Sequence, residues 1–339
     1  AALHAHIDRV ADAATSCESN SSHVGWIRND GTAVHVVNDE ARSRMTDYLW
    51  TNIMPYDVPN ALTLGFDPEG SPWNGDDDRL AAISRDLRRK NDTAMVDGLS
   101  DGILNQTLHY SLRAKALYPW TDSVPRSVYM EYVVPYAVVN EPRSDHRPLL
   151  FRALREMLKD YERPAGGGRS DVRLWGGAAR QTPRAQIKEA VKLINTRLWS
   201  ALGRPDQPVE FKAGLTPRIY DPLSVIAYGH SSCTGLAVLL VSALRSVGIP
   251  ARMAGTPAWK GEEENGNHSW VEVFLPGTTG GGEGEWIFLE PTPGIAEGNE
   301  DTADADDTDR DPCARWFCDA DRFDGSTEVY ATRFDKEAA

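Results

Sequence analysis

Three residues in the second half of the chain have side chains of the kinds used in thiol catalysis. Cys233 stands at the start of a long apolar run, His268 at the start of an alternating run, and Glu290 at the end of a short apolar run. A thiolate can attack a carbonyl carbon, an imidazole can move a proton, and a carboxylate can orient that imidazole. The three residues together predict a nucleophile, a base and an orienting acid.

The sequence around Cys233 predicts a helix over residues 233–247 with the cysteine in its first turn. Ser231 and Ser232 precede it as capping-type residues, and Gly248 follows the apolar run. A free thiol with a pKa of about 8.5 is mostly protonated at neutral pH, and the positive end of a helix dipole favours the thiolate. The backbone amide of Cys233 could also donate to an oxyanion. The alternative is a small buried hydrophobic side chain, which is how most free cysteines behave.

His268 and Glu290 are expected on neighbouring strands. The run H-S-W-V-E-V-F-L alternates, so His268 shares a face with Trp270 and Glu272. The run E-W-I-F-L-E predicts a second strand, joined to the first by a glycine-rich hairpin loop at residues 278–284. A base at the rim of a sheet, beside a helix N-terminus, suits a cysteine–histidine pair. Taken singly, a structural histidine and an ordinary strand-end acid remain the alternatives.

The motifs that contain these residues resemble those of the transglutaminase-like superfamily. They read S-C-T-G-L-A-V-L-L-V-S-A-L-R-S-V-G-I-P-A-R, N-H-S-W-V-E-V-F and E-W-I-F-L-E-P-T, and they fall within residues 220–294. An upstream Y-V-V-P-Y and N-E-P-R, with W-F and Y-A-T towards the end, resemble a little-characterised bacterial-type branch. The resemblance implies an α+β fold, in which a papain-like or transglutaminase-like catalytic core follows a mostly helical N-terminal region.

The resemblance also implies a role for each residue. It makes Cys233 the nucleophile, His268 the general base and acid, and Glu290 the orienting carboxylate. The superfamily usually has aspartate at the last position, so Glu272 is kept as an alternative acid. Folds of this kind often take an oxyanion donor from an upstream Trp or Gln, for which Trp199 is the candidate here.

The function implied is acyl transfer from an amide or peptide bond through a thioester on Cys233. Hydrolysis is the favoured outcome, which would make the protein a cysteine peptidase or amidase with a protein or peptide substrate and with no cofactor or metal. One alternative is a protein-glutamine gamma-glutamyltransferase, in which a lysine amine resolves the thioester. A second is a peptide:N-glycanase, although the paired C-x-x-C zinc motifs are absent from the sequence. The third is a non-catalytic binding module on the same fold.

The chain is expected to divide into an N-terminal region, residues 1–163, and a catalytic domain, residues 169–339. The boundary is the run P-A-G-G-G at residues 164–168, the clearest break in composition. Beyond it, Thr182 before Pro183 predicts the start of a helix that carries apolar residues on one face.

Charge and hydropathy limit the partners. The chain has 339 residues and a formal net charge of −14, which argues against nucleic acid and anionic membranes. No apolar run reaches the roughly 18 residues that a spanning helix needs. The acidic residues 299–311 lack the glycine and the closing glutamate of a calcium-binding loop, so a solvated loop is expected there. The oligomeric state is left open.

Four cysteines are too few for a disulfide scaffold. Cys313 and Cys318 could pair if their Cα atoms lie within about 7 Å, and Cys233 has no evident partner, which suits a nucleophile.

A secreted or luminal glycoprotein is expected, with a cytoplasmic protein as the alternative. The chain begins with Ala1, which removal of a signal peptide would explain. Four N-x-S/T sequons are present, at Asn20, Asn91, Asn105 and Asn267. Because Asn267 adjoins His268, a glycan there would block the site, so Asn267 is predicted to be unmodified.

Overall fold

The computed structural model describes residues 23–27, 33–54, 57, 101–163, 181–204, 207–212, 221–277, 283–293 and 325–334. Several predictions from the sequence lie outside these ranges. They concern Cys313, Cys318, the boundary at residues 164–168 and the acidic residues 299–311.

The described chain contains both helices and strands, and the predicted α+β class is confirmed. The helices are α2 (Asn38–Thr51), α5 (Asp101–Leu117), α6 (Arg126–Tyr132), α7 (Arg147–Met157), α8 (Pro183–Leu202), α9 (Pro222–Tyr228) and α10 (Cys233–Ser246). The strands are β1 (His23–Ile27), β2 (Ala33–Val37), β3 (Glu210–Phe211), β4 (His230–Ser231), β5 (Ala251–Thr256), β6 (His268–Leu275), β7 (Glu285–Leu289) and β8 (Tyr330–Ala331).

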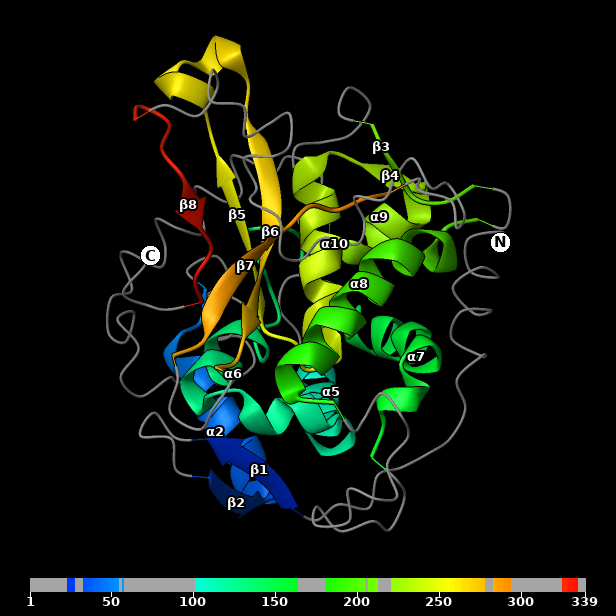
Figure 1. Cartoon of the computed structure of the whole chain (residues 1–339), viewed down its shortest axis with the longest axis vertical. Coiled ribbons are helices and arrows are strands. Elements are labelled where there is room, and N and C mark those ends of the chain that lie inside the picture. Colours follow the sequence, from blue (N-terminus) through cyan, green and yellow to red (C-terminus); the bar gives the residue numbers. More distant parts are fainter. Residues whose placement is uncertain are drawn as a thin grey trace.

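A four-stranded antiparallel sheet of order β7-β6-β5-β8 packs against the central helix α10 (Figure 1). The predicted hairpin of β6 and β7 is present. One face of β6 carries Val271, Val273 and Leu275, which are fully buried in the same hydrophobic cluster as α10. The opposite face carries Trp270 and Phe274, which contact rings on β7. The period-two pattern of the sequence therefore divides β6 into a helix-facing side and an aromatic side.

Helix α10 is buried on all sides by the helices and the sheet that pack around it, and apolar residues therefore occur all around its circumference. Residues 235–246 are all buried, as expected for a helix whose hydrophobic residues are not confined to one stripe. The helix ends before Gly248, which has a φ of 78°. A Cβ there would lie 2.6 Å from Cγ2 of Thr121, so both the left-handed backbone and the close approach of Thr121 require glycine.

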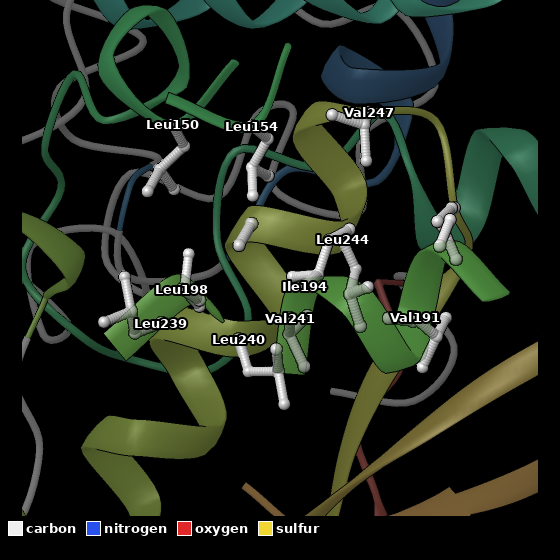
Figure 2. Close-up of a cluster of buried hydrophobic side chains, with 14 of the residues drawn as sticks. Leu150, Leu154, Val191, Ile194, Leu198, Leu239, Leu240, Val241, Leu244 and Val247 are labelled. Carbon is white, nitrogen blue, oxygen red and sulfur yellow. The ribbon is translucent and has the colours of Figure 1, made fainter. Parts of the chain in front are cut away.

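Helix α8 packs beside α10 and also reaches the sheet, because its Asn195 contacts the segment that follows β7 (Figures 1 and 2). It begins as predicted, because the side chain of Thr182 accepts a hydrogen bond from the Ala185 amide at 3.3 Å and Pro183 fills the first helical position. Its apolar face carries Val191, Ile194 and Leu198, which pack among leucine and valine side chains of α10 (Figure 2).

The described part of the N-terminal region is mostly helical, and it shares the main hydrophobic cluster. Tyr110 of α5 and Leu150 of α7 belong to the same cluster as α8, α10 and the sheet. A second cluster joins α2, α5 and α6 and includes Phe334 from the end of the described chain. The division into two domains remains a prediction, and these contacts indicate that N-terminal helices take part in the packing around α10.

Two elements of the fold were not predicted from the sequence. The first is the antiparallel hairpin of β1 and β2, in which Gly25 lies opposite His35. The Y-A-T segment near the end of the chain forms β8, which pairs with β5 at the edge of the sheet. In the described part of the chain, no helix combines the length and the apolar character needed to cross a membrane.

Candidate active site

Cys233 is the first residue of α10 and is partly exposed. Ser232 occupies the N-cap position without a side-chain capping hydrogen bond. Gly235, in the first turn, lies so close to Ser231 that a Cβ would be 1.9 Å from the Ser231 hydroxyl oxygen. Glycine at this position therefore lets the chain from β4 pass directly under the first turn and present the thiol at its rim.

Thr234 and Ser269 join the start of α10 to the start of β6. Their hydroxyl oxygens lie 3.1 Å apart, and the backbone N–H of each donates to the Cys233 sulfur. Two backbone donors directed at a sulfur stabilise the thiolate more than the neutral thiol. The junction of α10 and β6 thus stabilises a negative charge on the Cys233 sulfur.

His268 is the first residue of β6, and its side chain is nearly buried. Its register partner is Thr256 of β5. Next to it, a Cβ on Gly255 would lie 2.6 Å from the His268 carbonyl oxygen, so the missing side chain allows the two strands to pair closely beside the imidazole. The imidazole forms a hydrogen bond with the thiol of Cys233.

Glu290 directly follows β7 and reaches the same imidazole. Leu289 pairs with Val271, which places Glu290 diagonally across from His268 on the same face of the sheet. Nε2 of His268 lies 3.2 Å from each carboxylate oxygen of Glu290. Because Nε2 faces the carboxylate, the other ring nitrogen, Nδ1, is left for the thiol.

These contacts shift the pKa values of both members of the thiol–imidazole pair. Burial raises the pKa of Cys233, but the hydrogen bond and positive charge of His268, together with the two backbone donors, outweigh it and lower that pKa below its usual value. Burial lowers the pKa of His268, but Cys233 and Glu290 outweigh it and raise that pKa to about 9. The arrangement favours a thiolate beside an imidazolium at neutral pH.

The alternative acid, Glu272, is engaged elsewhere. Its carboxylate lies 2.6 Å from Nε of Arg252, its register partner on β5. The Arg252 guanidinium also lies over the Trp286 ring, 4.2 Å from its centroid. Glu272 therefore forms a cross-strand ion pair, and Glu290 is the acid that contacts His268.

The suggestion that Trp199 supplies an oxyanion donor is wrong. Trp199 is almost fully buried in α8, and its Nε1 donates to the Asn195 carbonyl oxygen at 2.6 Å. Another histidine near the thiol, His230, stands on β4 just before α10, and its Nδ1 donates to the Tyr228 carbonyl oxygen at 3.1 Å.

Asn195 is a residue of this region that the sequence did not point to. It lies on the buried face of α8, and its side-chain amide donates to the Glu290 carbonyl oxygen at 2.8 Å. A polar residue on an otherwise apolar helix face was the only available signal, and many buried asparagines give the same signal. Among the described residues, no group of three or more His, Cys, Asp or Glu side chains is placed to hold a metal ion.

The model of the transglutaminase-like superfamily matches residues 180–291. That range begins just before α8 and ends just after Glu290, so it includes Cys233 and His268. The chain therefore contains a transglutaminase-like superfamily domain, and this superfamily includes cysteine peptidases and transglutaminases. Neither the comparison with curated proteins nor that with solved structures gave a match.

Proposed function

We propose that the protein is a thiol-dependent hydrolase of amide or peptide bonds that works through a thioester on Cys233. The observation that carries the proposal is the shared imidazole, because His268 forms a hydrogen bond with the thiol and its Nε2 lies 3.2 Å from the carboxylate of Glu290. This order of contacts is that of a nucleophile, a base and an orienting acid.

In the first half of the proposed cycle, the Cys233 thiolate attacks the carbonyl carbon of the scissile bond. A C–S bond forms, and the carbonyl π electrons move to the oxygen, where the backbone amide of Cys233 can donate to them. When the intermediate collapses, the C–N bond breaks and the His268 imidazolium gives its proton to the departing amine. The products of this half are an amine and a thioester.

In the second half, neutral His268 takes a proton from water, and the resulting hydroxide attacks the thioester carbonyl. Collapse breaks the C–S bond and releases a carboxylic acid, and the thiolate–imidazolium pair is restored. Glu290 stabilises the imidazolium and fixes the ring so that Nδ1 faces the sulfur. A lysine amine in place of water would give a transglutaminase reaction from the same thioester.

The first test is the pH dependence of Cys233 alkylation by limiting iodoacetamide, resolved by site with mass spectrometry. We expect rapid labelling below about pH 7, because the thiolate persists where an ordinary thiol is protonated. His268→Ala is expected to move the profile towards the ordinary midpoint of about 8.5, and Glu290→Ala to move it less.

His230→Ala is the matched control, because it removes a nearby imidazole that is engaged with the Tyr228 carbonyl, and it is expected to leave the profile unchanged. An ordinary profile in the wild-type protein would contradict the proposal and favour a non-catalytic binding module. Hydrolysis and amine transfer are separated by reaction in heavy-oxygen water with a labelled primary amine. Heavy oxygen in the product acid identifies hydrolysis, and a labelled amide identifies transfer.

A further inference from the structure

Glu290, whose carboxylate contacts His268, lies just beyond the last residue of β7 that pairs with β6. The pairing of β6 with β7 ends at Leu289, and Pro291 has no N–H to donate to a neighbouring strand. Glu290 and Thr292 therefore need partners from outside the sheet. Their positions matter because a side chain can keep a contact of 3.2 Å with His268 only if its backbone is fixed.

Asn195 of α8 supplies those partners. Its Nδ2 donates to the Glu290 carbonyl oxygen at 2.8 Å, and its Oδ1 accepts from the Thr292 amide at 3.3 Å. The Thr292 hydroxyl also donates to the Asn195 carbonyl oxygen at 3.4 Å. One side-chain amide thus binds the backbone on both sides of Pro291, much as a neighbouring strand would.

The Asn195 side chain, which tethers the backbone around Pro291 to α8, is itself fixed in position. Asn195 is 2% exposed, and its neighbours Val191, Ile194 and Leu198 pack into the core beside α10 (Figure 2). Because α10 begins with Cys233, the packing of α8 on α10 relates the backbone of the acid to the helix that carries the thiol. The side-chain amide of Asn195 is buried, and its Nδ2 and Oδ1 both bind the backbone of residues 290–292.

We propose that Asn195 is a positioning residue, which holds the backbone of Glu290 so that its carboxylate stays against His268 and keeps the imidazole protonated beside Cys233. The proposal rests on the proposed roles of those three residues in thiol chemistry. Asn195 contacts neither the thiol nor the imidazole, so it acts through Glu290.

The test is the NMR titration of His268 in the full chain with Cys233→Ser, where the thiol no longer contributes to the pKa. Asn195→Leu keeps the side-chain volume in the core and removes the tether. We expect it to lower the His268 midpoint by about one pH unit, the size of effect typical for loss of a close carboxylate. Combined with Glu290→Ala, it should cause no further fall, because the tether acts only through that carboxylate.

Ile194→Val is the matched control, since it loosens the same helix face without touching the tether. It should lower the thermal unfolding midpoint and leave the His268 midpoint unchanged. Asn195→Ser, which keeps a short polar group, replaces the leucine variant if that variant does not fold, and it should give a smaller shift in the same direction. An unchanged His268 midpoint in a folded Asn195 variant would overturn the proposal.

Cys233 alkylation, measured in the protein with its native cysteine, separates this proposal from the proposed function. If His268 responds to Asn195 while Cys233 labels as an ordinary thiol, the tether stands and the enzymatic function fails. If Cys233 is activated and neither its profile nor the His268 midpoint responds to Asn195→Leu, the function stands and the tether fails.

Discussion

The two ends of helix α10 both hold charged side chains away from bulk water, but they use them in different ways. At the N-terminal end, Cys233, His268 and Glu290 contact one another, and a proton can pass between the thiol and the imidazole. At the C-terminal end, Arg147 and Arg245 donate to backbone carbonyl groups, which cannot take a proton. The first arrangement suits chemistry, and the second suits stability.

At the C-terminal end of α10, two buried arginines donate hydrogen bonds to backbone carbonyl groups. Arg147 is 1% exposed, and it donates to the carbonyl oxygens of Arg245, Val133 and Pro135. Arg245 donates to the Ala137 carbonyl oxygen at 2.8 Å. These bonds tie the segment between α6 and α7 to the last turn of α10, where the helix dipole favours positive charge.

The pKa values of the charged groups at the two ends of α10 differ in the same way. Burial lowers the pKa of Arg147 to about 9 and that of Arg245 to about 10, so both groups remain cationic at neutral pH. At the other end, the pKa of His268 is raised to about 9 while that of Cys233 is lowered, and the two groups change charge as a pair. The two ends thus differ in whether the partner of the buried charge can exchange a proton.

The largest expected effect comes from Cys233→Ala. We expect hydrolysis of a small activated ester to fall by roughly 10⁴-fold or more, since a missing nucleophile removes the covalent pathway. The free energy of unfolding, measured with urea, should change by less than about 1 kcal/mol, because the side chain is only partly buried and small. A large loss of stability with little loss of activity would show that Cys233 has a structural role. The two ends of α10 would then not differ as described.

Arg147→Met should give the opposite result. It removes the donor of the buried carbonyl groups of Val133 and Pro135, whereas the carbonyl of Arg245 still accepts from the Gly248 amide. Each unsatisfied group costs about 1–3 kcal/mol, so we expect unfolding by urea to become easier by at least about 2 kcal/mol. The pH profile of Cys233 alkylation should not move. Arg333→Met is the control, because its ion pair with Glu131 is half exposed on the arginine side and should contribute less than about 1 kcal/mol. A shifted alkylation profile in folded Arg147→Met would show that the two ends of α10 are coupled.

The parts of the site that could be predicted from the sequence are those with local signals. Thr182 before Pro183 marks the start of α8, and Ser232 before Cys233 with Gly248 beyond marks α10. Alternation after His268 predicts β6 and, with it, the position of the imidazole at a strand start. Each signal reports on residues within one or two turns of the chain.

The parts that could not be predicted depend on contacts between distant residues. Asn195 and Glu290 are 95 positions apart, and Arg147 and Arg245 are 98 apart, so no local pattern links either pair. The β1–β2 hairpin was missed for another reason. The sequence carries Asp30-Gly31 between two short alternating runs, a hairpin signal from which no strand was predicted.

The smallest predicted effect concerns the pH dependence of stability, and it tests whether only the cysteine end responds to pH. The pKa of His268 is raised to about 9 in the folded protein, against about 6.5 in an unfolded chain. Its contribution to stability is therefore fully present below about pH 6.5 and is lost as the pH rises through about 9. Glu290→Gln should weaken that contribution by about 1.4 kcal/mol for each unit by which it lowers the His268 pKa.

Urea unfolding of wild type and Glu290→Gln at pH 6, 7, 8, 9 and 10 would measure the difference, which should shrink across this series as the wild-type imidazolium loses its proton. Glu272→Gln is the matched control, because it makes the same substitution on the neighbouring strand and its partner is the guanidinium of Arg252. Guanidinium groups, unlike imidazoles, are not deprotonated in proteins. The difference between Glu272→Gln and wild type should stay constant with pH. If both variants showed the same dependence, the pH response would belong to the sheet as a whole, because the contact between Glu290 and His268 would then not be its source.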